Sequence, residues 1–452
     1  MISMANHTTA RSIRRGPSDG LSVIKQGPHQ YHTTGIERML LLILVILIPL
    51  EPSLPTVAGF TSPYIMFAVL TGYILLNRPG SLARTWSHPV FLAAFCLLMI
   101  AILIESAHPL SDYTDIFRIG QMFVAAIFVA SLCRDRPALR AGIYGFLLAG
   151  VLVSILLVLT TYGTLQQATA TTFGEASKVR REALEDVGET LVGLAVTPAR
   201  GAAVALAFGL MAKSALRRNL FLGITLLCLI GAFLPMSRGG MVIAIASCAT
   251  VIFAYGVRHV RVLLITAVLA VAALIWVPEA VFARFTLTPE TPAGKTEIRT
   301  RIYKAALENL PQYALAGVGA GNFWGPWGMQ SDYYKTHRGE GHRRGAVLGA
   351  HNVFIQFAIF WGLAALLGLI VVVYLSYRCL PRGGGKDVLV LCLYGIAVSL
   401  VLQMMVSHVL TAKEFSLGLG LLVGGHRWIW PQGLIPSARR GQGRRHPAFE
   451  HA

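Results

Sequence analysis

Hydrophobic segments follow one another from about residue 39 to residue 430, and one long polar stretch, residues 284–350, interrupts them. Most of the apolar segments approach the roughly 20 residues that a helix needs to cross a bilayer. The polar stretch is rich in Arg, Lys, His, Gly and aromatic residues, and a new apolar segment begins where it ends, at His351 and Asn352. Because loops commonly carry the functional side chains of a rigid scaffold, we expect the working site in this polar stretch.

The apolar segments predict an all-α, polytopic integral membrane protein with about twelve transmembrane helices. The candidate spans are residues 37–57, 61–77, 89–107, 116–133, 140–162, 191–212, 219–236, 239–257, 260–282, 351–377, 387–410 and 415–431. One large loop then separates spans 9 and 10. The predicted organisation is a basic tail (1–36), spans 1–9 (37–283), the large loop (284–350), spans 10–12 (351–431) and a second basic tail (432–452). With 55% hydrophobic and 13% charged residues, the composition also favours a membrane protein over a soluble domain.

The basic residues orient these spans. Of the 39 Lys and Arg residues, 23 fall in the two tails and in alternate short loops, and each of these loops has at least two. This positive-inside pattern places both tails in the cytoplasm and the 284–350 loop outside. The first 35 residues are polar and basic, and no short apolar run with a small-residue cleavage site follows them, so we expect an uncleaved cytoplasmic tail. The basic residues form short groups between spans instead of one soluble face, which argues against nucleic-acid binding.

The other sixteen basic residues depart from this rule, and nine of them lie in the large loop. Cations held at the outer surface suit an anionic ligand, and guanidinium groups match phosphate oxygens in a fork. Alternatively, several of them meet lipid phosphates or pair with nearby Glu side chains. Arg200 and Arg238 are expected at outer helix ends or slightly within the membrane, where a charge is costly and usually functional.

The loop itself has readable local structure. Residues 296–310 have the periodicity of an amphipathic helix, on which Arg299 and Tyr303 share a face. The glycine-rich stretch 316–325 follows a helix and no strand, so it fails the context of a dinucleotide loop and predicts a tight turn packed onto the membrane surface. Trp324 and Trp327 suit either sugar stacking or interfacial anchoring.

Histidine and cysteine do not predict a metal site or a cofactor. The spacing of His337 and His342 matches no closed metal site, and neighbouring Arg residues would repel a cation. The six cysteines do not cluster in a polar region, as a disulfide framework or a zinc site would require. His351 differs, because it stands where the polar loop meets an apolar helix. There it would either accept a proton from a hydroxyl group or begin the helix as a capping residue.

Three sequence motifs together resemble one family. Residues 350–363 (AHNVFIQFAIFWGL) resemble the hallmark segment of the O-antigen ligase and polysaccharide polymerase family of bacterial envelopes. Residues 236–240 are similar to its Ser-Arg-Gly turn, and residues 299–307 followed by 317–323 resemble its Arg-bearing loop helix and glycine turn. The resemblance covers about residues 200–375. Tyr303 stands where an aromatic residue, often Trp, is expected.

This resemblance implies a membrane glycosyltransferase of the bacterial inner membrane with its active site facing the periplasm. The donor would be a polyprenyl-diphosphate-linked glycan, and the acceptor a lipid A core or a growing polysaccharide. The expected catalytic residues are Arg238, Arg299 and His351, with Arg200, Arg301, Tyr303 and Asn352 in substrate binding. The arginines would stabilise the diphosphate leaving group, and His351 would act on the acceptor hydroxyl.

Other functions remain open on the sequence. Ligase and polymerase share the donor chemistry and differ only in the acceptor. A flippase or transporter for a lipid-linked sugar would favour charges along several mid-membrane helices and an internal repeat. The charges instead gather at the outer face, and no repeat is evident. A receptor or assembly scaffold would not need the observed placement of Arg and His.

Overall fold

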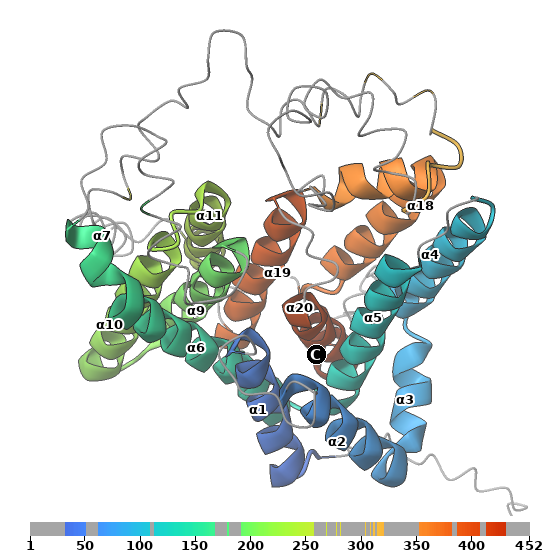
Figure 1. Cartoon of the computed structure of the whole chain (residues 1–452). Coiled ribbons are helices and arrows are strands. Elements are labelled where there is room, and N and C mark those ends of the chain that lie inside the picture. Colours follow the sequence, from blue (N-terminus) through green and yellow to red (C-terminus); the bar gives the residue numbers. More distant parts are fainter. Residues whose placement is uncertain are drawn as a thin grey trace, which may run out of the picture. The chain divides into compact units, whose positions relative to one another are not determined.

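The computed structural model describes residues 32–50, 62–108, 113–167, 191–256, 314–320, 352–381, 387–406 and 413–430, with single positions at 179, 268, 277, 281, 303, 308 and 311. Every regular element within these described ranges is a helix (Figure 1). The elements lie within one compact unit, residues 33–452.

The helices of the N-terminal half are α1 (Gly35–Leu50), α2 (Ser62–Asn77), α3 (Pro79–Trp86), α4 (Pro89–Ser106), α5 (Thr114–Leu132), α6 (Arg136–Leu157), η2 (Val158–Tyr162) and α7 (Gly163–Gln167). They are followed by α9 (Leu191–Met211), α10 (Ala215–Phe233), α11 (Arg238–Tyr255), α18 (Val353–Arg378), α19 (Val388–Val406), α20 (Lys413–Gly424) and η7 (Gly425–Ile429). Local chemistry fixes several starts. Asp135 caps α6 by accepting a hydrogen bond from the Ala138 N–H at 2.8 Å, and Ser214 caps α10 in the same way.

Eight of these helices are long and apolar enough to cross a membrane, and a bent pair formed by α2 and α3 would make nine. The eight are α4, α5, α6, α9, α10, α11, α18 and α19. The predicted spans at 37–57 and 415–431 correspond to α1 and to α20 with η7, which are shorter helices. The span at 260–282 falls largely outside the described residues. The all-helical, polytopic membrane fold is therefore confirmed, and the count of twelve spans stays a prediction.

Helix α9 is the most enclosed of the long helices, and it packs against α6, α10, α11 and α19. Its small residues allow close approach. A Cβ atom on Gly150 of α6 would lie only 2.7 Å from the Cα atom of Gly201 of α9. Without a strong hydrophobic force between helices in lipid, such close backbone packing is a main source of association. The glycines thus make α9 the packing centre of α6, α10, α11 and α19.

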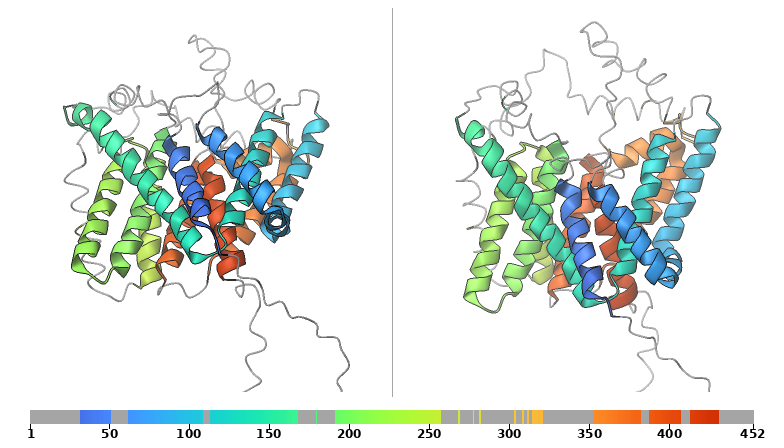
Figure 2. Two further views of the ribbon diagram at one scale, coloured as in Figure 1. Left: turned by 90° about the horizontal axis from the view of Figure 1, so that it is seen from below. Right: turned by 60° about the horizontal axis from the view of Figure 1, so that its bottom comes forward.

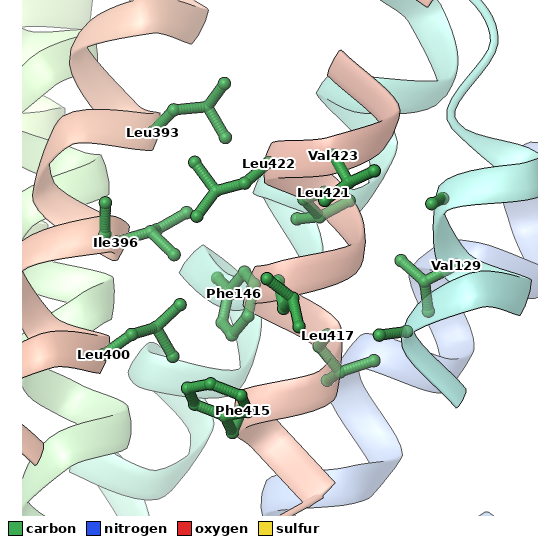
Figure 3. Packing of buried hydrophobic residues seen from close by; sticks show 14 of the residues in the cluster. Val129, Phe146, Leu393, Ile396, Leu400, Phe415, Leu417, Leu421, Leu422 and Val423 are labelled. Carbon is green, nitrogen blue, oxygen red and sulfur yellow. The ribbon is translucent and has the colours of Figure 1, made fainter. Parts of the chain in front are cut away.

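Helix α20 forms a second centre, between α5 and α19. Figure 3 shows Phe415, Leu417 and Leu421 of α20 packed among buried side chains of neighbouring helices. A Cβ atom on Gly420 would lie 2.6 Å from the Cβ atom of Val129 in α5. Helix α19 joins the two centres, because it contacts α9 and α11 as well as α18 and α20 (Figures 1 and 2). The elements that carry the candidate site therefore meet around α19.

Candidate functional site

The Ser-Arg-Gly turn at the start of α11 holds Arg238 in a defined place. Met236 is buried and has a left-handed backbone (φ +52°), which is uncommon for a residue with a side chain. Ser237 is the N-cap residue, and its hydroxyl accepts a hydrogen bond from the Gly240 N–H at 3.3 Å. Arg238 is then the first residue of an 18-residue helix, and it is exposed. A guanidinium beside a helix N-terminus makes this end favourable for an anion.

The two glycines after Arg238 let this helix end fit between two neighbours. A Cβ atom on Gly240 would lie 2.2 Å from the Cβ atom of Ala195 in α9. One on Gly239 would lie 3.1 Å from Val406, the last residue of α19. A larger residue at position 240 would push α11 away from α9. The glycines of the motif therefore set the position of Arg238 against both helices.

Arg200, in the middle of α9, belongs to a buried polar network. Its Nη1 atom donates to the Glu414 carboxylate at 2.7 Å, its Nε atom donates to the Ser399 hydroxyl at 3.0 Å, and Nη2 donates to the Gln403 side chain. The Thr197 hydroxyl donates to the other Glu414 oxygen at 2.7 Å. All five residues are buried, and Arg200 has no exposed surface. An ion pair enclosed in this way is stable only because its other hydrogen-bonding groups also find partners.

This network lies within about one and a half helical turns of the contacts that the Arg238 turn makes with α9 and α19. Arg200 follows Ala195 by five residues, which is about 7.5 Å of helix rise, and Gln403 precedes Val406 by three. The sequence placed Arg200 among the residues that bind substrate. The structure gives its three guanidinium nitrogens to protein acceptors instead. Its described position ties α9 to α19 and α20.

The start of α18 is capped by Asn352. Its Oδ1 atom accepts hydrogen bonds from the N–H groups of Phe354 (3.0 Å) and Ile355 (3.1 Å). An asparagine at this position satisfies two of the N–H groups that a helix start leaves without partners. The capping role that the sequence left open for His351 therefore falls to Asn352.

Helix α18 is broken at Trp361 and Gly362, so that its two halves point in different directions (Figure 1). The break is filled by residues 314–320, which we call the glycine turn. Val318 and Gly319 donate backbone hydrogen bonds to the carbonyls of Ile359 (2.8 Å) and Phe360 (2.9 Å), and the Leu363 N–H donates to the Ala314 carbonyl (2.8 Å). Backbone groups freed inside a membrane helix need such replacement partners. The glycine turn of the loop and the hallmark segment are thus joined through their backbones.

Glu105, near the end of α4, binds both parts of this junction. Its Oε2 atom accepts hydrogen bonds from the Trp361 indole N–H and from the Ala320 backbone N–H, each at 2.9 Å. Its side chain is fully buried, as is that of Trp361. The nearby His108 ring nitrogen adds a 3.3 Å contact to the Ala316 carbonyl. Glu105 was not singled out by the sequence, because its two partners lie more than 200 residues away along the chain.

One group of described residues has the donor atoms for a metal ion: His88, Cys379 and His426, whose ligand atoms lie within 4.8 Å of one another. The His88 Nδ1 atom accepts from the Val90 N–H at 3.3 Å, which leaves its proton on Nε2, facing His426 Nδ1 at 3.3 Å. Burial first, and then His426 and Arg427, lower the pKa of His88 to about 4, so the ring is neutral near pH 7. In this tautomer the His88 Nε2–H group points toward His426 Nδ1. The two histidines of the cluster therefore form a hydrogen-bonded pair.

An apolar cavity of about 650 Å³ lies between α2, α4 and α5. It is lined mainly by aromatic and aliphatic side chains, among them Phe95, Ile102 and Phe117, and Lys413 is at its wall. A cavity with such an apolar lining favours hydrocarbon chains over polar groups.

The structure locates part of the predicted site. Arg238 and Asn352 stand at the starts of α11 and α18, and α19 contacts both of these helices. Tyr303 is helical and half-buried, and Glu308 is also helical, which agrees with the helix expected there. Arg299, Arg301 and His351 lie outside the described residues. Their predicted roles therefore stay predictions.

Comparison with known proteins finds one family that part of the chain resembles. Residues 223–370 match the family model described as O-antigen ligase. Over this region the chain is similar to the O-antigen ligase family. A search of curated proteins found no match to the chain.

The match confirms the family resemblance that the sequence motifs gave. It falls within the predicted 200–375 region and includes the Arg238 turn, the glycine turn and the broken helix α18 up to residue 370. Glu105 lies outside it, and so do all five residues of the buried polar network: Thr197, Arg200, Ser399, Gln403 and Glu414. Glu105, from a helix that precedes the match in the sequence, therefore binds two residues of the matched region, Ala320 and Trp361.

Proposed function

We propose that the protein is a membrane glycosyltransferase that moves a glycan from a polyprenyl diphosphate onto a lipid A core, as an O-antigen ligase does. The observation that carries this proposal is that the O-antigen ligase match includes an exposed arginine, Arg238, at the N-terminus of a long helix. A fork-shaped cation beside aligned backbone N–H groups suits the diphosphate of such a donor. The apolar cavity between α2, α4 and α5 suits the lipid chain of a substrate or of the bilayer.

The reaction exchanges one bond at the anomeric carbon for another. The acceptor hydroxyl oxygen attacks this carbon, and the bond from the carbon to the diphosphate oxygen breaks with its electron pair. The acceptor proton passes to His351, and the polyprenyl diphosphate leaves with the negative charge. Arg238 and Arg299 stabilise that charge where it develops, which raises the rate only if they are already in place. Arg301, Tyr303 and Asn352 contribute to substrate binding, and Arg200 supports the site through the buried polar network.

The site is proposed to face the periplasm of a bacterial inner membrane. This follows from the positive-inside distribution of the basic residues, which puts the large loop outside. A lipid-linked glycan that has reached the outer leaflet would meet Arg238 and the loop there.

A polymerase of the same family is the second candidate, because it uses the same donor and differs in taking another glycan chain as acceptor. A flippase or transporter for a lipid-linked sugar is less well supported. The one described arginine deep in a long helix, Arg200, is engaged with Glu414, Gln403 and Ser399, which suits packing better than a transport path.

The test is transfer by purified protein in detergent, with a polyprenyl-diphosphate-linked glycan and two acceptors offered in parallel: lipid A core and a free glycan chain. A ligase forms the lipid A product, and a polymerase forms the extended glycan. Wild-type protein that binds the donor but forms neither covalent product would contradict the proposal and favour a carrier.

A further inference from the structure

We propose that Glu105 is a positioning residue for this reaction: its carboxylate clamps the glycine turn of the large loop onto the break in α18. We call Glu105, Trp361 and Ala320 the carboxylate clamp. The inference rests on the proposed function, because it assigns Glu105 a task in the same site. The clamp arises from outside the matched O-antigen ligase region, since only Trp361 and Ala320 lie within residues 223–370.

The geometry of the clamp joins two segments that the chain separates. One oxygen of Glu105 receives a hydrogen bond from Trp361 in α18 and another from Ala320 at the end of the glycine turn, both at 2.9 Å. Hydrogen bonds to a charged acceptor are roughly twice as strong as neutral ones. Because one atom holds both donors, the turn and the helix cannot move apart without losing at least one bond.

The burial of Glu105 indicates more than packing. A carboxylate removed from water costs several kcal/mol unless it is well paired, and an ionisable side chain within a membrane helix is a functional hypothesis by default. Glu105 is fully buried near the end of a helix that is long and apolar enough to span the bilayer. An apolar side chain would fill this place without that cost, but it would leave the two N–H groups without an acceptor.

The carboxylate clamp joins two segments of the proposed site, the glycine turn and the first half of α18. The glycine turn follows the loop segment that carries Arg299 and Tyr303. The first half of α18, residues 353–360, runs from the break back to Asn352, which is next to His351. Eight helical residues form a rod about 12 Å long, so its far end depends on how its near end is fixed. Holding the turn on the break therefore fixes residues 314–320 of the loop relative to the first half of α18.

The carboxylate clamp adds a connection that the backbone hydrogen bonds of the junction do not make. The three backbone hydrogen bonds of the junction all lie between residues 314–319 and 359–363, so they involve only the turn and α18. Glu105 ties that junction to α4, and His108, just beyond the end of α4, contacts the turn at Ala316. The turn is thus anchored to a second membrane helix, which limits rotation of the junction as a unit.

The experiment uses the whole chain in detergent with a polyprenyl-diphosphate-linked glycan as donor. The variants are Glu105→Ala, Glu105→Gln and Trp361→Phe. The matched controls are Ser106→Ala, at the exposed position after Glu105, and Trp428→Phe, in η7, which packs against α6 and α20. Three quantities are measured: donor Kd, the single-turnover rate of transfer, and amide hydrogen exchange of peptides covering residues 314–320 and 353–363.

We expect Glu105→Ala and Trp361→Phe to slow transfer between about tenfold and about a hundredfold, as a small displacement of reacting groups does. Donor Kd should change less than about threefold, because Arg238 is untouched. Exchange should rise in the glycine turn and at the break, and not in α9. Glu105→Gln keeps an oxygen acceptor and should lose less activity than Glu105→Ala. Both controls should behave as wild type.

Each other outcome counts against the inference. Unchanged exchange in the turn, or normal transfer despite increased exchange, would overturn the positioning role. If Glu105→Ala does not fold, Trp361→Phe carries the same test, since it removes a single N–H donor and keeps an aromatic ring. Wild-type protein without transfer activity would overturn the proposed function, whereas an active wild type with fully active clamp variants would overturn this inference alone.

Discussion

Gly317 of the loop and Gly362 of α18 lie backbone against backbone where the glycine turn fills the helix break. Both have a left-handed backbone, with φ of +67° and +73°. A Cβ atom on Gly317 would lie 2.2 Å from the Phe360 carbonyl oxygen, and one on Gly362 would lie 2.5 Å from the Leu315 carbonyl oxygen. Neither position accepts a side chain unless the junction opens, so the two glycines are a requirement of the contact.

We therefore expect Gly317→Ala to separate the glycine turn from α18, lowering both thermal stability and glycan transfer. The matched control is Gly256→Ala, because Gly256 also has a positive φ (+119°), but a Cβ atom there would have no neighbour within 4 Å. Backbone strain alone costs about 1–2 kcal/mol, and only position 317 adds a collision. The measurement is the shift in Tm of each purified variant. Equal shifts at the two positions would contradict the close contact.

The buried pair of Arg200 and Glu414 should matter far more for stability than an exposed ion pair. Glu414→Gln leaves the Arg200 charge enclosed without its carboxylate, a change that typically costs about 3–5 kcal/mol. Asp387→Asn removes the partner of Arg136, whose side chain is 52% exposed, and should cost about 0–1 kcal/mol. Thermal unfolding in detergent compares the two. Similar shifts in Tm would argue against the buried polar network as a structural link.

Asn352 caps α18 in the structure, and we propose that it also contacts the substrate. Two substitutions separate these two roles. Asn352→Ser keeps a good N-cap residue, whereas Asn352→Ala removes it at a cost of about 0.5–2 kcal/mol. If the amide also binds substrate, Asn352→Ser should keep the Tm of wild type and still weaken substrate binding. Titration of donor and acceptor onto each variant measures this. Unchanged binding by Asn352→Ser would limit the residue to its capping role.

Topology gives a prediction that is independent of the chemistry. Cysteines introduced at Gln330, Ala215 and Gly383 are offered to a membrane-impermeant thiol reagent in intact cells. The basic groups near positions 215 and 383 should hold those loops in the cytoplasm, and the large loop should lie outside. Position 330 should therefore react at once, and positions 215 and 383 only after the cells are permeabilised. Protection of position 330 would overturn the proposed orientation.

Much of the helical fold was predictable from local patterns. The span expected at 239–257 corresponds to α11, Arg238–Tyr255, because a long apolar run follows a serine that can cap a helix. The glycines after Arg238 and those of the turn were recognised as special positions. Their partners in space were not, since Ala195, Val406 and Phe360 carry no signal that points to a glycine elsewhere in the chain.

The break in α18 and the polar networks were not predictable for the same reason. Residues 351–377 form a nearly continuous apolar run, so the sequence predicted one span, and glycine is common in membrane helices. The break depends on the 314–320 segment supplying replacement hydrogen bonds. Glu105 and Glu414 could not be singled out from the sequence, because their partners come from distant parts of the chain. Such pairings form only when the helices pack together, and they produce no periodic pattern in the sequence.

In the proposed mechanism, Arg238 binds the diphosphate of the donor while His351 acts on the acceptor hydroxyl, and substitutions at the two positions should separate these tasks. Arg238→Lys keeps the positive charge but loses the planar fork, and so it should bind the donor less well than wild type. His351→Asn removes the basic ring nitrogen, and Asn352 still caps the helix. Arg118→Ala is the matched control, since Arg118 is another exposed arginine near a helix start and pairs with Asp115.

Donor binding and single-turnover transfer, measured together on purified Arg238→Lys, Arg238→Ala, His351→Asn and Arg118→Ala, test this division of tasks most directly. We predict that both Arg238 variants lose donor binding and transfer together. His351→Asn should bind the donor as wild type does and lose most of its transfer, and Arg118→Ala should retain both. Full transfer by His351→Asn, or unchanged donor binding and transfer by Arg238→Ala, would contradict the mechanism.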